Sequence, residues 1–266
     1  MRRGLERSRK SRAGTEILCE RVFRPLAHLV VLALLPLRVP PPVVVAASGA
    51  AGIAGAVALA HGHLVAAALL VQLKTVLDNA DGQLARLSGR TSAFGRYLDS
   101  EVDLLVDAAL FAGLGAYTGA WPAALAGFLA LTAVLSVNFN AERLYRAERG
   151  DVSPMPAAES RPTTVLRRLY ELVYAPQDRL VERFAERRLR GAPAQARLAY
   201  HDAATVSVLA NLGMSTQLAV FGLCLAAGRP LAFVWIVLAE LGLVAALALR
   251  RELLLRGVVH RPEEAL

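Results

Sequence analysis

Cysteine is scarce in this 266-residue chain, where only Cys19 and Cys224 occur, far apart and in different kinds of segment. A disulfide framework or a thiolate metal site is therefore not expected. Aromatic residues make up only 6% of the chain and are not interleaved with basic residues, so we expect no nucleic-acid partner. Internal repeats, low-complexity tracts and a separate soluble domain are also lacking, and a hydrophobic content of 55% excludes general disorder.

The chain contains long apolar runs, and most of its charged residues lie between these runs. This pattern is typical of a helical membrane protein, whereas a large soluble core would spread its charges more evenly. The net charge of +8 then indicates attraction to anionic lipid headgroups. We predict an all-α membrane protein with six transmembrane helices, at residues 42–60, 63–81, 99–119, 121–141, 204–226 and 230–249.

The other segments complete the predicted organisation. The apolar run at 26–37 is too short to span a bilayer, so Glu16–Leu37 is interpreted as an amphipathic helix lying in the membrane interface. In the first span Gly49, Gly52 and Gly55 are three residues apart, which favours close approach by another helix. The boundaries are a basic N-terminus at 1–40, transmembrane helices 1–4 at 41–141, an amphipathic insert at 142–203, helices 5–6 at 204–250 and a tail at 251–266.

The insert is rich in arginine and is expected to form two amphipathic helices, near 165–173 and 180–189, with a turn at 174–178. They would lie on an anionic leaflet, or alternatively form an arm that binds a partner. With six spans, both termini and the insert share one side of the membrane. That side collects every basic residue except Lys74, inside a span, and Arg229. The positive-inside rule therefore predicts that the termini are cytoplasmic. The expected location is a bacterial inner or plasma membrane.

Two pairs of aspartates lie where the second span ends and the third begins. Asp78 and Asp81 are spaced i,i+3, and Asp99 and Asp103 are spaced i,i+4, so each pair occupies one face of a helix. Carboxylates at the ends of apolar segments need a positive partner, and hard divalent cations prefer their oxygens. Helix-end stabilisation would explain Asp99 and Asp103. It would not explain Asp78 and Asp81, because they oppose the dipole at a helix C-terminus.

Three residues beside the first pair point toward phosphate. Gly82 and Ala85 are small enough to let a ligand approach the backbone, and Arg86 supplies a planar cationic fork. Carboxylates, divalent metal and arginine together describe phosphoryl-transfer chemistry, in which a spare carboxylate deprotonates a hydroxyl nucleophile. The residues alone therefore predict a membrane phosphotransferase with its site at the cytoplasmic interface.

At these residues the chain resembles the CDP-alcohol phosphotransferase (CDP-alcohol phosphatidyltransferase) family. All eight specified positions of its signature, D-x2-D-G-x2-A-R-x8-G-x3-D-x3-D, are present. The resemblance implies transfer of a phosphatidyl or related group from a CDP-linked lipid donor, such as CDP-diacylglycerol, to an alcohol or polyol-phosphate acceptor in phospholipid synthesis. CMP is released, and homodimers are common among similar proteins.

The same resemblance implies roles for individual residues. Two Mg²⁺ or Mn²⁺ ions would be held by all four aspartates, with Asp103 also the general base. The residues implied to contact the donor are Gly82, Ala85, Arg86 and Ser92, with Gly95 structural in the motif. In the first span, Pro42 and Val45 replace an Asn and a Thr of many relatives. Ser48 and Gly49 stand where glycerol-phosphate users often have arginine, which disfavours glycerol 3-phosphate.

The acceptor pocket is expected to involve Lys74, Asn140 and Arg143. Lys74 lies one turn before Asp78, so it either borders the site and contacts phosphate, or it pairs with Asp78 or extends to the membrane surface. A divalent-cation transporter or channel is the alternative function, although a buried lysine would repel cations. A catalytically silent scaffold is disfavoured because no motif position is missing.

Overall fold

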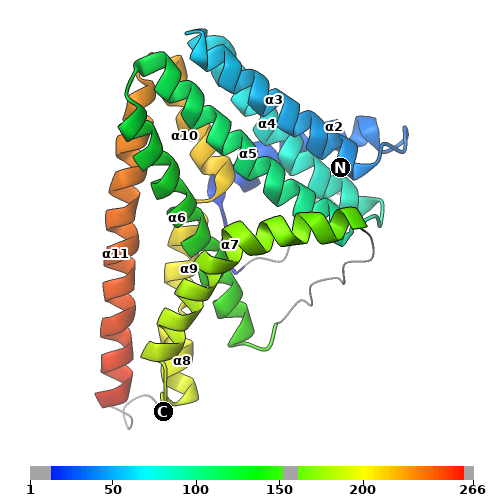
Figure 1. The fold of residues 1–266 in the computed structure, drawn as a ribbon. Coiled ribbons are helices and arrows are strands. Elements are labelled where there is room, and N and C mark those ends of the chain that lie inside the picture. The colour runs from blue at the N-terminus through cyan, green and yellow to red at the C-terminus, as the bar shows by residue number, and fades with distance from the viewer. Residues whose placement is uncertain (1–12, 152–160, 261–266) are drawn as a thin grey trace.

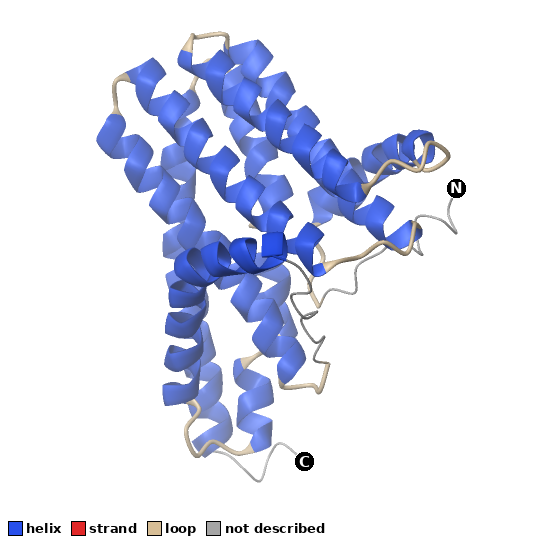
Figure 2. Cartoon of the chain, turned by 45° about the vertical axis from the view of Figure 1, so that its right-hand side comes forward, coloured by secondary structure: helices blue, strands red, loops and turns tan. Residues whose placement is uncertain are grey.

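The computed structural model describes residues 13–151 and 161–260, and every regular element within these two ranges is helical (Figure 1). Figure 2 shows that the described part of the chain consists of helices and loops. The helices are η1 (Cys19–Phe23, a π-helical turn), α2 (Arg24–Leu34), α3 (Pro41–Ala60), α4 (Leu64–Leu87), α5 (Ala93–Thr118), α6 (Trp121–Ala147), α7 (Arg161–Arg188), α8 (Ala194–Tyr200), α9 (Ala203–Ala210), α10 (Met214–Ala226) and α11 (Pro230–His260). The residues predicted as basic N-terminus at 1–12, part of the insert at 152–160 and the last part of the tail at 261–266 lie outside the described residues.

Four stretches of the described residues are long and apolar enough to cross a membrane. They are Pro41–Ala60, Trp121–Ala147, Ala194–Ala226 and Pro230–Gly257. Helices α4 and α5 coincide with the other two predicted spans, but they carry the charged residues of the motif, which lower their hydropathy. The predicted span 204–226 is interrupted, because α9 ends at Ala210 and α10 begins at Met214. The all-helical architecture and these apolar stretches fit an integral membrane protein.

Helix α3 packs closely against α5, as the glycine spacing predicts. A Cβ atom at Gly52 would lie 2.4 Å from a methyl carbon of Val106, and one at Gly49 would lie 2.7 Å from a methyl carbon of Val102. These distances are well below van der Waals contact, so only glycine permits the observed approach. Val102 and Val106 lie on either side of Asp103 in α5. Their contact with α3 therefore sets the position of the motif aspartates relative to α3.

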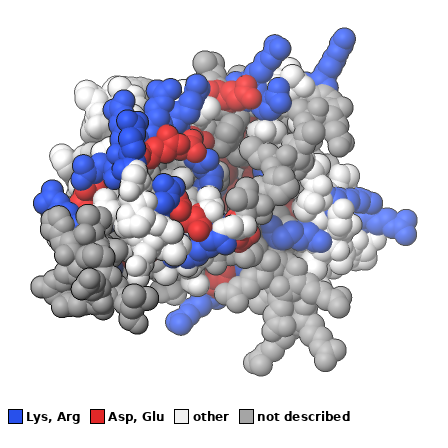
Figure 3. Space-filling model, turned by 90° about the horizontal axis from the view of Figure 1, so that it is seen from below, with Lys and Arg blue, Asp and Glu red and all other residues white. Residues whose placement is uncertain are grey.

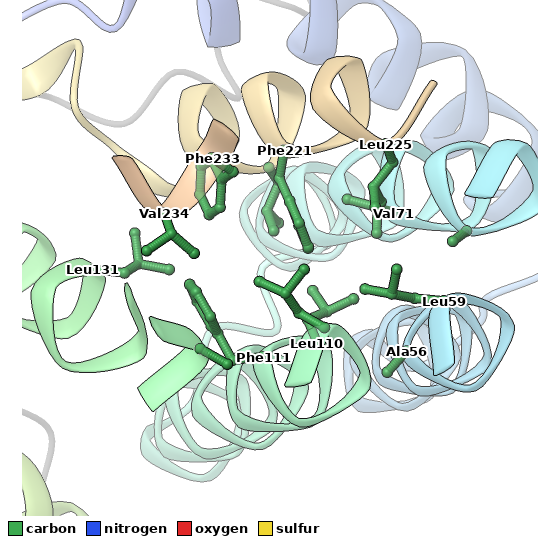
Figure 4. Packing of buried hydrophobic residues seen from close by; sticks show 14 of the residues in the cluster. Ala56, Leu59, Val71, Leu110, Phe111, Leu131, Phe221, Leu225, Phe233 and Val234 are labelled. Atoms are coloured by element: carbon green, nitrogen blue, oxygen red, sulfur yellow. The ribbon is translucent and has the colours of Figure 1, made fainter. Parts of the chain in front are cut away.

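The apolar core lies farther along α5 than the motif aspartates, toward the turn between α5 and α6. Figure 4 shows Phe111 of α5 facing Phe221 of α10 and Phe233 of α11, with Leu131 and Val234 beside them. The centroids of the Phe221 and Phe233 rings are 4.7 Å apart, and those of Phe111 and Phe221 are 6.3 Å apart. Burial of these large rings ties α5 to the C-terminal helices and gives the motif helix a rigid base.

The N-terminal segment docks onto the bundle through Glu16. This side chain is 3% exposed, and its Oε1 accepts hydrogen bonds from the backbone N and the Oγ1 of Thr216, at 2.8 and 3.0 Å. Glu16 thereby caps the start of α10 at the break that follows α9. The Ile17 amide donates to Asn211 Oδ1 within this break, at 3.0 Å. The predicted helix Glu16–Leu37 is present as η1 and α2, and its lying in the membrane interface stays a prediction.

Helix α7 corrects the prediction for the insert. The prediction of a turn at 174–178 is wrong, because α7 runs unbroken from Arg161 to Arg188 with Pro176 inside it. A proline removes one backbone hydrogen bond, and contacts on both sides of Pro176 offset that loss. The Tyr174 hydroxyl donates to the Ser100 carbonyl at 3.1 Å, and Asp178 accepts from Asn140 Nδ2 at 2.6 Å. Figures 1 and 2 show α7 crossing the helices of the bundle, close to the beginning of α5.

Candidate functional site

Three of the four motif aspartates converge where α4 and α5 lie side by side. One carboxylate oxygen each from Asp78, Asp99 and Asp103 lies within 4.8 Å of the others. Asp78 comes from the last turns of α4, whereas Asp99 and Asp103 come from the first turns of α5. The structure therefore brings the two pairs together across the connection between these helices, as expected from the sequence.

The connection reverses the chain through Gly89 and Ser92. Gly89 has a φ of +66°, a backbone conformation that glycine adopts without strain. Ser92 is the N-cap of α5, and its Oγ accepts the backbone N–H of Gly95 at 3.0 Å. A Cβ at Gly95 would lie 3.3 Å from this Oγ, which supports the structural role predicted for Gly95. Contact between Ser92 and a donor stays a prediction, since its hydroxyl serves as a helix cap.

Asp81 is buried beside the three converging aspartates. Its side chain is 6% exposed, and among the described residues Oδ2 has no hydrogen-bond partner. It also interacts electrostatically with three carboxylates, those of Asp99, Asp78 and Asp103, and with the ammonium of Lys74. A buried carboxylate oxygen without a partner is costly, and four carboxylates outnumber the ammonium of Lys74, so a further positive charge would stabilise this cluster. The donor set is all carboxylate, which fits Mg²⁺ or Mn²⁺.

Lys74 partly supplies the missing charge. Its side chain is 1% exposed, and its Nζ donates to Asp78 Oδ1 at 2.8 Å and to Asp103 Oδ1 at 2.5 Å. Of the two interpretations left open by the sequence, pairing with Asp78 is present, and the pairing extends to Asp103 on the neighbouring helix. Lys74 therefore bridges α4 and α5 at the site itself.

Gly82, Ala85 and Arg86 occupy the last two turns of α4. The Arg86 guanidinium folds back over Gly82, where Nη1 would lie 3.2 Å from an added Cβ. The absence of a side chain at Gly82 therefore leaves room for the guanidinium. Ala85 is half-buried on the same helix.

Asn140 and Arg143 both turn toward α7. The buried Asn140 amide donates to Asp178 and accepts from Arg143 Nη2 at 3.0 Å. Arg143 Nη1 also lies 3.5 Å from Glu182 of α7. These predicted acceptor residues therefore belong to a polar contact between α6 and α7, and their binding of an acceptor stays a prediction.

Two residues with structural links to the site were not singled out from the sequence. Asp107, 7% exposed, follows Asp103 by one turn, and the i,i+4 spacing of Asp99 and Asp103 continues to it. Asn79 lies within the motif, and its amide accepts from Cys19 Sγ and donates to Ser215 Oγ, each at 3.1 Å. Asn79 thus ties the back of α4 to η1 and α10. Only the tertiary structure identifies these partners, whereas spacing alone could have indicated Asp107.

Comparison with known proteins places these features in a family. The sequence profile described as CDP-alcohol phosphatidyltransferase matches residues 38–176, more than half of the chain, including the whole motif. A bifunctional IPC transferase and DIPP synthase of Rubrobacter xylanophilus is 38% identical over 34% of this chain and 20% of its own length. An archaetidylinositol phosphate synthase of Methanothermobacter thermautotrophicus is 38% identical over 30% of this chain and 40% of its own length.

The chain thus spans less than half the length of these curated relatives. Among solved structures, a phosphatidylinositol phosphate synthase of Mycobacterium tuberculosis with CDP-DAG bound aligns with 79% of this chain and 94% of its own. The sequence identity is 21% and the TM-score is 0.38.

Proposed function

The chain belongs to the CDP-alcohol phosphatidyltransferase family, and we propose that it transfers a phosphatidyl or related phosphoalcohol group from a CDP-linked lipid donor to an alcohol acceptor. CDP-diacylglycerol is the proposed donor, CMP the leaving product and phospholipid synthesis the process. The observation that carries the proposal is the convergence of Asp78, Asp99 and Asp103 at the end of two helices that hold the complete motif.

The four aspartates fit a site for two divalent ions, Mg²⁺ or Mn²⁺. Such ions, when bound by Asp78, Asp81, Asp99 and Asp103, neutralise the negative charge of a diphosphate. The orphaned Oδ2 of Asp81 supports this assignment, because it is buried where a positive partner is missing. Gly82, Ala85, Arg86 and Ser92 form the proposed donor side, with the Arg86 fork suited to phosphate oxygens.

Asp103 is the proposed general base. Its carboxylate takes the proton of the acceptor hydroxyl, and the hydroxyl oxygen attacks the β-phosphorus of the donor. The bond between this phosphorus and the bridging oxygen breaks, and that oxygen leaves as part of CMP. Lys74 holds one oxygen of Asp103 by a hydrogen bond, which fixes the orientation of the carboxylate.

The proposed acceptor carries a phosphate, and Arg143 with Asn140 forms its pocket. Arg143 keeps 40% of its side chain exposed while Glu182 holds it at 3.5 Å, so the guanidinium is directed toward α7 and remains accessible. One relative is named for archaetidylinositol phosphate, which makes inositol phosphate the first acceptor to test.

The proposed topology has six spans, with both termini and the motif on the cytoplasmic side and α2 in the membrane interface. Figure 3, seen from below, shows arginine and lysine side chains around the acidic ones on this face. Basic residues on one face are attracted to anionic lipid headgroups, which we propose as partners of this surface. Homodimer formation stays a prediction from the family.

The function is tested by CMP release. Purified protein receives CDP-diacylglycerol, Mn²⁺ or Mg²⁺ and a panel of acceptors that includes inositol phosphate, glycerol 3-phosphate, inositol and serine. At least one acceptor is expected to yield CMP, and Asp103→Asn is expected to reduce the rate by roughly 100-fold or more.

Asp151→Asn is the matched control, because Asp151 is an exposed carboxylate that pairs with Arg146 away from the site. If no acceptor yields CMP, or if Asp103→Asn keeps the parental rate, the proposal is wrong. Metal flux into proteoliposomes without CMP release would instead support the transporter. The structure disfavours that alternative, since the buried ammonium of Lys74 lies between two of the carboxylates.

A further inference from the structure

Lys74 is an unusual neighbour for a cation site. Its ammonium is buried, bonded to Asp78 and Asp103, and lies outside the eight positions of the family signature. A cation in this place positions both carboxylates while it competes with any metal ion for the same oxygens. The charge of the cluster therefore depends on a residue that the motif does not specify.

Asp107 carries the charge opposite to that of Lys74. It lies one turn beyond Asp103 on the same face of α5, is buried, and interacts electrostatically with Lys74 and Asp78. It too lies outside the signature. A buried carboxylate is costly unless it offsets a buried charge, and the nearby buried cation with which Asp107 interacts is Lys74.

We propose that Lys74 and Asp107 are a matched pair of positioning residues, in which Lys74 holds Asp78 and Asp103 together before metal binds and Asp107 offsets the charge of Lys74. Four motif carboxylates balance two divalent ions. Lys74 adds one positive charge to that balance, and Asp107 removes it. Loss of Lys74 alone makes the cluster more negative, which strengthens its attraction for the two ions. Loss of Asp107 alone makes the cluster more positive, which weakens that attraction.

The inference rests on the proposed metal site, and metal binding rather than turnover tests it. The dissociation constant of Mn²⁺ is measured by titration calorimetry on the full chain in nanodiscs, for the parent, Lys74→Gln, Asp107→Asn and the double variant. Lys74→Gln is expected to bind Mn²⁺ about tenfold more tightly, because the competing charge is gone. Asp107→Asn is expected to bind about tenfold more weakly, and the double variant within about threefold of the parent.

Two controls separate charge from packing. Glu101→Gln removes a carboxylate from a different face of α5 and is expected to leave Mn²⁺ affinity unchanged, whereas Asp107→Glu keeps the charge and is expected to restore binding. Thermal unfolding in a chelator is a second readout. There Lys74→Gln is expected to unfold at a lower temperature than the parent, because Asp78 and Asp103 repel each other without the ammonium between them.

The outcomes are separable. If the parent binds no Mn²⁺, the proposed metal-dependent function fails. If the parent binds Mn²⁺ but Asp107→Asn binds it equally well, or if Lys74→Gln binds it more weakly than the parent, the matched pair is wrong while the function stands. If Lys74→Gln does not fold, the two variants of Asp107 decide. The pair is supported if Asp107→Asn binds Mn²⁺ more weakly than the parent while Asp107→Glu binds it as the parent does. The pair is overturned if Asp107→Asn and the parent bind Mn²⁺ equally well.

Discussion

Asp81 differs from the other motif aspartates in its surroundings. Lys74 reaches Asp78 and Asp103, whereas the Oδ2 of Asp81 is buried with no hydrogen-bond partner among the described residues. Such an oxygen destabilises the fold by an amount that a bound cation would recover. Residues of this kind are retained for function at the expense of stability.

Replacing Asp81 by Asn is therefore expected to stabilise the metal-free protein and to weaken metal binding. The buried charge disappears while the shape of the side chain is kept, a gain of about 1–3 kcal/mol in the free energy of unfolding. Thermal unfolding with a chelator and with excess Mn²⁺ measures both effects. The unfolding temperature should rise in chelator, and the further rise caused by Mn²⁺ should shrink. A lower unfolding temperature in chelator would contradict this account.

At single residues, spacing and side-chain chemistry predicted which aspartates would meet, because helix periodicity places i,i+3 and i,i+4 neighbours on one face. They could not decide how Lys74 is used, since that depends on the distance between α4 and α5. The same holds for Ser92, which the resemblance places at the donor and the structure shows as the cap of α5. Local sequence does not distinguish a hydroxyl that caps a helix from one that contacts a ligand.

At the scale of the helices, the contact between α3 and α5 sets the position of the motif aspartates in the bundle. Gly52→Ala is expected to destabilise the protein by about 1–3 kcal/mol, because the new methyl group would overlap the stiff side chain of Val106. Since Val106 lies next to Asp107 and three residues after Asp103, CMP release should fall as well. Thermal unfolding in detergent measures the loss of stability.

A second variant and a control make this test specific. Val106→Ala removes the atoms that clash, so Gly52→Ala combined with Val106→Ala should be less destabilised than the two single effects predict together. Gly242→Ala on α11 has open space around the new methyl group and is expected to leave stability unchanged or raise it. Additive effects of Gly52 and Val106 would show that their contact does not limit the helix approach.

Helix boundaries were predicted less well than helix contacts. Pro176 was interpreted as a turn, because proline usually ends a helix, and α7 nevertheless continues through it. The stabilising contacts come from Ser100 and Asn140, which are distant in sequence and invisible to a local pattern. The break between α9 and α10 was missed for a related reason. Its backbone groups are capped by Glu16, near the other end of the chain.

For the molecule as a whole, apolar runs predicted helical segments, although the run at 204–226 is divided between α9 and α10. Four stretches of the described residues are long and apolar enough to cross a membrane, and the number of six spans stays a prediction. Helices α4 and α5 are not among these four stretches, because they carry the site. A membrane enzyme must place charge within its spans, so hydropathy is least informative where function is located.

Orientation is testable by labelling two loops at opposite ends of the bundle. In a background with Cys19→Ser and Cys224→Ser, His63→Cys lies in the exposed α3–α4 turn and Thr91→Cys in the exposed α4–α5 connection. A membrane-impermeant maleimide added to intact cells should label His63→Cys, and it should label Thr91→Cys only after the membrane is opened. Labelling of Thr91→Cys in intact cells would reverse the proposed orientation.

The bond between Glu16 and Thr216 joins residues separated by 200 positions. A ribosome adds about 5–20 residues per second, so Glu16 leaves the ribosome roughly 10–40 s before its partner is made. During that interval the N-terminal segment is without the contact that anchors it, and the start of α10 has no cap until the two meet. The contact that caps α10 therefore forms only after Thr216 has been made, 200 residues later than Glu16.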